Sequence, residues 1–158
     1  MRKGDNSKMA KTIWFDMDGT IADLYGVENW LPMLIASDPA PYMLAKPLLR
    51  LSTLAYMLNR LQKMGYRIGV ISWLAKNGTP AYGADVTATK LAWLAKHLPS
   101  VQWDEINIVP YGTPKQVFCG SPADILFDDE QPNRDNWSGN AYDVDNIIGV
   151  LKSLTASR

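Results

Sequence analysis

Cysteine and histidine are scarce in this sequence, each being present only once, as Cys119 and His97. A single cysteine excludes an intrachain disulfide and favours a reducing compartment. The first eleven residues are polar and basic and lack the apolar run of a secretory signal. No stretch approaches the 18 or so consecutive apolar residues of a membrane span. We therefore expect a soluble cytoplasmic protein with no membrane partner.

An excess of charge of either sign is also absent, since 16 basic side chains balance 16 acidic ones. This balance gives no strong signal for nucleic acid or for an anionic membrane surface as a partner. What is present is ordinary globular content, with 47% hydrophobic residues in 158. That length is typical of one domain with a sizeable core. We expect a single domain over residues 1–158, of which residues 1–10 form a polar N-terminal tail.

Four short apolar runs, rich in β-branched and aromatic residues, predict buried strands with helical patterns between them. The strands are expected at 12–15, 67–72, 106–109 and 123–127, and the main helices at 48–64, 86–97 and 144–154. Asp85 is the expected cap of the second of these helices, after a surface loop at 76–83. One or two helical turns are expected within 113–118. Strands that alternate with helices in this way predict parallel βαβ units, hence a layered α/β domain.

Polar side chains stand where three of the predicted strands end. Asp16 follows the first strand, Ser72 closes the second, and Asp128 and Asp129 follow the last. In an open parallel sheet these ends share one edge, where ligands bind. Carboxylates brought together repel one another unless a cation neutralises them, and Mg²⁺ prefers oxygen ligands and accepts phosphate as another. The pattern therefore predicts a metal, and a phosphate with it.

The motifs occur in the order typical of one superfamily. DMDGT at 16–20 follows an apolar strand, then come Ser72, a lysine within PKQVF, and the acidic pair of ILFDDEQPN. This order resembles the haloacid dehalogenase-like superfamily, and within it the 5′(3′)-deoxyribonucleotidase-like phosphatases. The resemblance implies a three-layer, Rossmann-like parallel sheet with a small helical cap, here the proline-containing insertion at 21–47 with a short helix near 27–36.

The resemblance also implies a role for each motif residue. Asp16 would be the nucleophile that forms an aspartyl-phosphate, and Asp18 the acid/base, as hydrolysis requires. Phosphate would be bound by Ser72, Lys115 and the backbone N–H groups around Gly19 and Thr20. Magnesium would be bound by Asp16, Asp128, Asp129 and the backbone carbonyl of Asp18.

Two lysines compete for the phosphate-binding position. Lys115 lies thirteen residues before Asp128, the better fit to the family spacing, whereas Lys90 is expected to be a solvated helix lysine. Other polar residues are expected to be structural. Asp23 is expected to cap a helix or to be solvated, His97 to serve packing or the helix dipole, Cys119 to serve packing, and Glu130 to be a solvated turn residue.

The insertion carries Trp30, Met33, Tyr42 and Met43. Its aromatic residues either stack on a nucleobase, as Trp73 beside Ser72 also would, or pack the insertion against the core. A cap this small leaves an open site, which suits a large substrate or a lid from a second subunit in a homodimer. The first hypothesis is a magnesium-dependent phosphomonoesterase acting on nucleoside monophosphates. One alternative is a phosphatase that acts on another ester, either a sugar phosphate or a polynucleotide 3′-phosphate. The other is a non-catalytic phosphate- or nucleotide-binding module.

Overall fold

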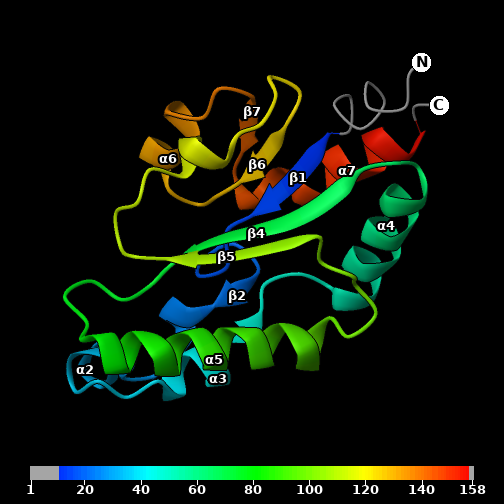
Figure 1. Ribbon diagram of the computed structural model, residues 1–158. Helices are drawn as coiled ribbons and strands as arrows, with labels where there is room; N and C mark the ends of the chain where they lie inside the picture. The colour runs from blue at the N-terminus through cyan, green and yellow to red at the C-terminus, as the bar shows by residue number, and fades with distance from the viewer. Residues whose placement is uncertain (1–10, 157–158) are drawn as a thin grey trace.

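A five-stranded parallel sheet forms the centre of the protein. The computed structural model describes residues 11–156. Every neighbouring pair of strands in the sheet is parallel, in the order β5-β4-β1-β6-β7 (Figure 1). The strands are β1 (Thr12–Phe15), β4 (Arg67–Trp73), β5 (Glu105–Val109), β6 (Ile125–Phe127) and β7 (Asn140–Tyr142).

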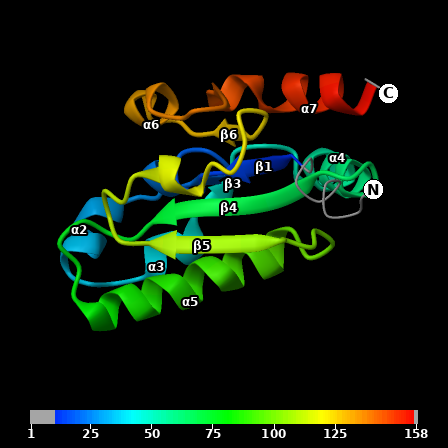
Figure 2. The same ribbon diagram turned by 45° about the horizontal axis from the view of Figure 1, so that its top comes forward.

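The register of the sheet brings the carboxyl ends of the central strands to one edge. Phe15 pairs with Val70 on one side and with Phe127 on the other. The residues that follow these positions therefore emerge together. Asp16 and Asp128 are the first residues after β1 and β6, as the sequence predicts. The arrowheads of β4 and β5 point to the side of the molecule where α2 lies (Figure 2).

Helices cover one face of the sheet, and shorter segments cover the other. The larger core joins alternate strand residues to α4 (Leu51–Lys63), α5 (Pro80–His97) and α7 (Ile147–Ala156). On the opposite face, Trp14 and Leu126 pack with Trp137, just after α6 (Gln131–Asp135), and with Phe118 of the 3-10 helix η2 (Lys115–Phe118). The fold is therefore the three-layer α/β arrangement that the sequence predicts.

The insertion at 21–47 is small and mainly helical, as expected. It contains η1 (Leu24–Gly26), α2 (Trp30–Ile35) and α3 (Ala40–Leu44), and it is closed by the antiparallel pair β2 (Ala22–Asp23) and β3 (Lys46–Pro47). Its Leu24 and Tyr42 pack with Tyr82 and Val86 of α5. Figure 1 shows α2, α3 and β2 gathered beside α5. This contact fixes the insertion over the edge where the strands end.

Several boundaries differ from the prediction for identifiable physical reasons. Helix α5 begins at Pro80, because the Thr79 side chain accepts a hydrogen bond from Tyr82 N at 3.1 Å. Residues 80–83 are thus helical rather than part of a loop, and Asp85 lies inside the helix instead of capping it. The last expected helix divides into η3 (Val144–Asn146) and α7. Strand β7 and helix α6 were not predicted, since three- and five-residue elements are too short for a periodic pattern.

None of the helices within residues 11–156 is both long enough and apolar enough to cross a membrane. The polar tail expected at 1–10 lies outside the described residues.

Candidate active site

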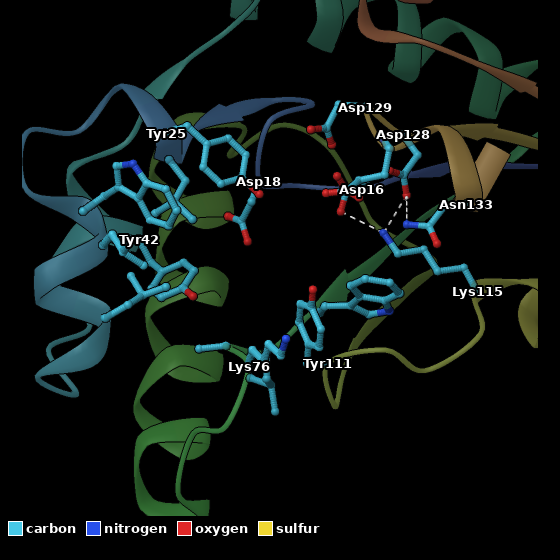
Figure 3. A pocket seen from close by; sticks show the side chains of 18 of the residues that line it. Asp16, Asp18, Tyr25, Tyr42, Lys76, Tyr111, Lys115, Asp128, Asp129 and Asn133 are labelled. Carbon is cyan, nitrogen blue, oxygen red and sulfur yellow. Dashed lines mark hydrogen bonds and ion pairs between the residues drawn. The ribbon is translucent and has the colours of Figure 1, made fainter.

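Three carboxylates meet at the carboxyl edge of the sheet. Asp16, Asp128 and Asp129 each place an oxygen within 4.8 Å of the others (Figure 3). The backbone holds two of them in line with the strands, since Asp16 N donates to Phe127 O at 2.9 Å and Asp128 N to Tyr142 O at 3.1 Å. Because carboxylate oxygens are the ligands that hard divalent cations prefer, this donor set fits the predicted magnesium ion.

Lys115 lies between two of these carboxylates. Its buried ammonium donates to Asp16 Oδ1 at 2.8 Å and to Asp128 Oδ2 at 2.7 Å, as the dashed lines in Figure 3 mark. Burial acts to lower the pKa of Lys115, but the adjacent carboxylates outweigh it and raise the pKa above its ordinary value. The lysine chosen from its spacing to the acidic pair is therefore beside the expected nucleophile and fully charged.

The backbone N–H groups around Gly19 and Thr20 were predicted to bind phosphate. Those of Gly19 and Thr20 themselves are used within the turn, since Gly19 N donates to Ala22 O at 2.8 Å and Thr20 N to Met17 O at 3.0 Å. The turn consumes these donors because it must fold back tightly after β1. Instead, the buried hydroxyl of Thr20 lies 2.9 Å from Asp16 Oδ2 and accepts a hydrogen bond from Asp129 N at 3.1 Å. Thr20 thus joins the two acidic motifs through its side chain.

Helix α6, which the sequence did not predict, fixes one member of the acidic pair. Asn133 donates to Asp128 Oδ2 at 3.1 Å, Arg134 to Asp128 O at 3.0 Å, and Glu130 N to Asp128 Oδ1 at 2.9 Å. Asp129 is half-buried and lies at the edge of the cavity. Burial, followed by the charge of Asp16, raises the pKa of both Asp128 and Asp129. Such mutual repulsion is what a bound cation would relieve.

Asp18 lies outside the cluster of three carboxylates and pairs with a different lysine, Lys90. The Lys90 ammonium donates to Asp18 Oδ2 at 2.9 Å, to Ser72 Oγ at 2.7 Å and to Trp73 O at 2.7 Å. Burial raises the pKa of Asp18, and Lys90 opposes that rise only in part. A carboxyl group whose pKa is raised in this way can hold a proton for transfer.

Lys90 is the residue that sequence reasoning misplaced. It was expected to be a solvated helix lysine, yet it is 1% exposed and faces the site. The available signal was its position on the buried stripe of α5, with Val86 four residues before it and Leu94 four residues after it. A lysine on an apolar stripe must find a partner inside the protein.

Beside the acids lies a cavity of about 310 Å³ with a largely aromatic and aliphatic wall. The insertion contributes Tyr25, Trp30 and Tyr42, and the opposite side carries Trp73 and Tyr111. Figure 3 shows Tyr25 and Tyr42 on one side of the opening, and Tyr111 and Lys76 below it. The insertion residues Met33 and Met43 do not line this cavity, whereas Tyr42 both lines it and packs against α5.

The residues expected to be structural lie away from the reacting groups or make local contacts. Asp23 accepts from Gly26 N at 3.0 Å and so caps η1. His97 packs on Trp93, with ring centroids 4.5 Å apart, and Cys119 is half-buried on the opposite face of the sheet. Glu130 is the exception: it is exposed just before α6, but it lines the cavity and its backbone N–H donates to Asp128 Oδ1.

Comparison with known proteins gives a likeness of fold. No protein-family model and no curated protein sequence matches this chain. Among solved structures, D,D-heptose 1,7-bisphosphate phosphatase from Burkholderia thailandensis matches 93% of this chain and 99% of its own length, with a TM-score of 0.57 and 12% identity. A chain in the structure of the Pnkp1/Rnl/Hen1 complex matches 86% of this chain but only 46% of its own length, with a TM-score of 0.52 and 16% identity.

The order of the strands, the parallel sheet and these structural matches define a haloacid dehalogenase-like fold. Identities this low establish the fold alone.

Proposed function

We propose that this protein is a magnesium-dependent phosphomonoesterase that works through an aspartyl-phosphate. The observation that supports this most directly is that two carboxyl groups after β1, those of Asp16 and Asp18, have different surroundings. Asp16 lies in a charged cluster with Lys115 and the acidic pair, and Asp18, two residues away, has a separate environment that raises its pKa. Hydrolysis in two steps needs these two carboxyl groups to behave differently.

The residues account for each bond in the reaction. An oxygen of Asp16 attacks phosphorus, and the bond from phosphorus to the ester oxygen breaks while Asp18 gives that oxygen a proton. Water then attacks the phosphorus of the aspartyl-phosphate, Asp18 takes a proton from the water, and Asp16 is released with inorganic phosphate. Lys115 lines the cavity and would hold phosphate oxygens as the charge on them is redistributed. Ser72, the other predicted phosphate ligand, is fully buried behind the cavity wall and bonds to Lys90.

Magnesium fits the charge balance of the site as well as its donor atoms. Lys90 pairs with Asp18, and Lys115 pairs with Asp16 and Asp128, whereas Asp129 has no ion pair among the described residues. A cation bound by the cluster would allow its carboxyl groups to ionise together. Asp16, Asp128, Asp129 and the backbone carbonyl of Asp18 would hold the ion. When bound, it would neutralise charge on the phosphoryl group, which is the main catalytic requirement of such reactions.

The cavity favours a nucleoside monophosphate among the candidate substrates. A base is flat and can stack on Tyr25, Trp30 or Trp73, and each stacking contact is worth about 1 to 3 kcal/mol. A sugar phosphate would need several hydrogen-bonding partners beyond the phosphate, whereas the wall away from the carboxylates is mainly apolar. The proposed activity is therefore that of a nucleotidase, with deoxyribonucleotides included among its substrates.

The substitution Asp16→Asn tests the nucleophile. The amide cannot attack phosphorus, so we expect turnover of p-nitrophenyl phosphate with Mg²⁺ to fall to background while the circular dichroism spectrum and Tm remain those of a folded protein. Asp145→Asn, which removes an exposed carboxylate on η3, is the matched control and should retain full activity. Substantial turnover by purified Asp16→Asn would reject the nucleophile, and no turnover by wild type would favour a non-catalytic binding module.

A panel of esters tests the substrate class. Wild-type kcat/KM would be measured for ribo- and deoxyribonucleoside 5′- and 3′-monophosphates, sugar phosphates and an oligonucleotide with a 3′-phosphate. We expect the mononucleotides to be the best substrates. Equal or faster hydrolysis of sugar phosphates or of the oligonucleotide would remove the nucleotidase proposal and leave a phosphatase of another specificity.

A further inference from the structure

Lys90 occupies a core position whose neighbours along α5 are apolar. It lies on the stripe of α5 that also buries Val86, Trp93 and Leu94, and only 1% of it is exposed. Moving an ammonium ion out of water costs several kcal/mol unless it is well paired. Packing therefore gives no reason for a lysine here, and the reason must lie in what its charged end contacts.

All three N–H groups of the Lys90 ammonium already have acceptors. They are Asp18 Oδ2, Ser72 Oγ and Trp73 O, at 2.9, 2.7 and 2.7 Å. The ring of Tyr42 covers the ammonium as well, with its centroid 5.0 Å from Nζ. A lysine that has only three donors cannot bind a phosphate oxygen without giving up one of these bonds.

The two lysines of the site therefore have different tasks. Lys115 bonds two members of the acidic cluster and lines the cavity, whereas Lys90 is absent from the cavity wall. Lys90 instead ties the turn after β1, which carries Asp18, to the end of β4, which carries Ser72. These two segments are 54 positions apart in the sequence, and this ammonium joins their side chains.

The direction of each bond explains what Lys90 would set. It donates to Oδ2 of Asp18, which restrains the carboxyl group and would leave Oδ1 to exchange the proton with the leaving group. It also donates to Ser72 Oγ. Ser72 is fully buried and does not line the cavity, so this bond anchors the ammonium to the end of β4. One ammonium can thus orient the acid/base and hold it in register with the end of β4.

We infer that Lys90 is a positioning residue for hydrolysis, which holds Asp18 and Ser72 in mutual register without touching the substrate. This inference rests on the proposed function. Displacement of a reacting group by about 1 Å can cost about 100-fold in rate, so loss of this bridge should act on turnover more than on binding.

The kinetic test compares Lys90→Met with Lys96→Met. Lys96 is an exposed lysine of the same helix, so its substitution should change neither kcat nor KM. For Lys90→Met and a nucleoside monophosphate we expect kcat to fall about 100-fold while KM changes less than about threefold. Rates are measured where both variants are folded, and Lys90→Gln replaces Lys90→Met should the latter fold poorly.

Rapid-mixing experiments with p-nitrophenyl phosphate separate mispositioning from loss of folded enzyme. Its leaving group departs without a proton, so the first step no longer needs Asp18, whereas cleavage of the aspartyl-phosphate still does. Lys90→Met should therefore release close to one equivalent of p-nitrophenolate quickly and then turn over slowly. If the amplitude of the burst and the steady-state rate fell in the same proportion, part of the protein would be inactive, and this result would contradict a positioning role.

Crystal structures of wild type and Lys90→Met with Mg²⁺ and orthovanadate give a readout that does not depend on activity. The Asp18 carboxyl group and the Ser72 hydroxyl should leave their wild-type positions in the variant. Unchanged positions for both, together with an unchanged kcat, would overturn the inference. This comparison tests whether Lys90 positions the two side chains, and it does not depend on activity. Failure of wild type to hydrolyse any ester would therefore contradict the proposed function but not the positioning of Asp18 and Ser72 by Lys90.

Discussion

Asp16 and Asp18 are two positions apart in the sequence, yet the fold gives their carboxylates different neighbours. Asp16 meets Lys115 and Thr20, while Asp18 meets Lys90. The spacing of two residues in a turn after a strand allows this, because the carboxylates leave the chain in different directions. At the scale of the residue, the DMDGT segment predicted the two acids, and the surrounding side chains decide what each can do.

Gly19 makes the turn between these acids and the rest of the chain possible. Its φ is +82°, and a Cβ at this position would collide with the carboxylate of Asp129 and come within 2.9 Å of the Tyr25 ring. We expect Gly19→Ala to lower the free energy of unfolding by about 1 to 2 kcal/mol for the backbone alone, and to reduce kcat sharply because Asp129 must move. Urea unfolding and steady-state kinetics would measure the two effects.

Gly65 offers a matched control for that substitution. It also has a positive φ, +102°, but nothing lies within 4 Å of the place a Cβ would take. Gly65→Ala should therefore show a similar loss of stability with kcat unchanged. Equal kcat values for the two variants would mean that the close approach of Gly19 to Asp129 has no part in catalysis.

At the scale of the element, helix α5 serves the core, the insertion and the site at once. Trp93 and Leu94 pack in the main core, Tyr82 and Val86 hold the insertion, and Lys90 reaches Asp18. The start of this helix determines which of its residues face inward. Because Thr79 rather than Asp85 caps it, α5 gains the turn that contains Tyr82, whose hydroxyl donates to Asp38 O in the insertion at 2.9 Å.

The position of the cap can be tested with two alanine substitutions. Thr79→Ala removes the side-chain acceptor for Tyr82 N and should lower the free energy of unfolding by about 1 kcal/mol. Asp85→Ala, at an exposed position inside the helix, should change it by less than about 0.5 kcal/mol. Urea denaturation of both variants measures the difference. A larger effect at Asp85 would restore the helix start predicted from the sequence.

At the scale of the whole molecule, the chain is electrically balanced while its site is not. Burial and the charge of Asp16 raise the pKa of Asp128 and Asp129 above the ordinary value of 3.8. In the absence of metal, the folded protein therefore holds protons that the unfolded chain has lost. It follows that these groups stabilise the metal-free fold at low pH and that their contribution declines as the pH rises toward and beyond neutrality.

Magnesium should reverse that trend, because it binds ionised carboxylates and protons compete with it. We expect the rise in Tm on adding MgCl2 to be small near about pH 5 and larger near about pH 8, since binding to the folded state alone stabilises it. Thermal melts at each pH, with NaCl at matched ionic strength as the control, would measure this. Asp129→Asn should reduce the rise at pH 8, and an undiminished rise would place the ion elsewhere.

The sequence by itself determined the parallel α/β fold and most of the acidic site. Apolar runs that end in Asp16, Ser72 and Asp128 are local patterns, and parallel strands bring such ends together whatever joins them. Lys115 could also be placed, since its spacing to the acidic pair is short.

Only the tertiary structure decided the remaining contacts, because they join segments far apart in the chain. Lys90 looked like a solvated helix lysine until the packing of α5 turned it toward Asp18, 72 positions away. The amide of Gly19 looked available for phosphate until the turn was seen to use it. The helix that carries Asn133 was too short to predict. In each case the deciding factor was the partner of a polar group, which local periodicity does not specify.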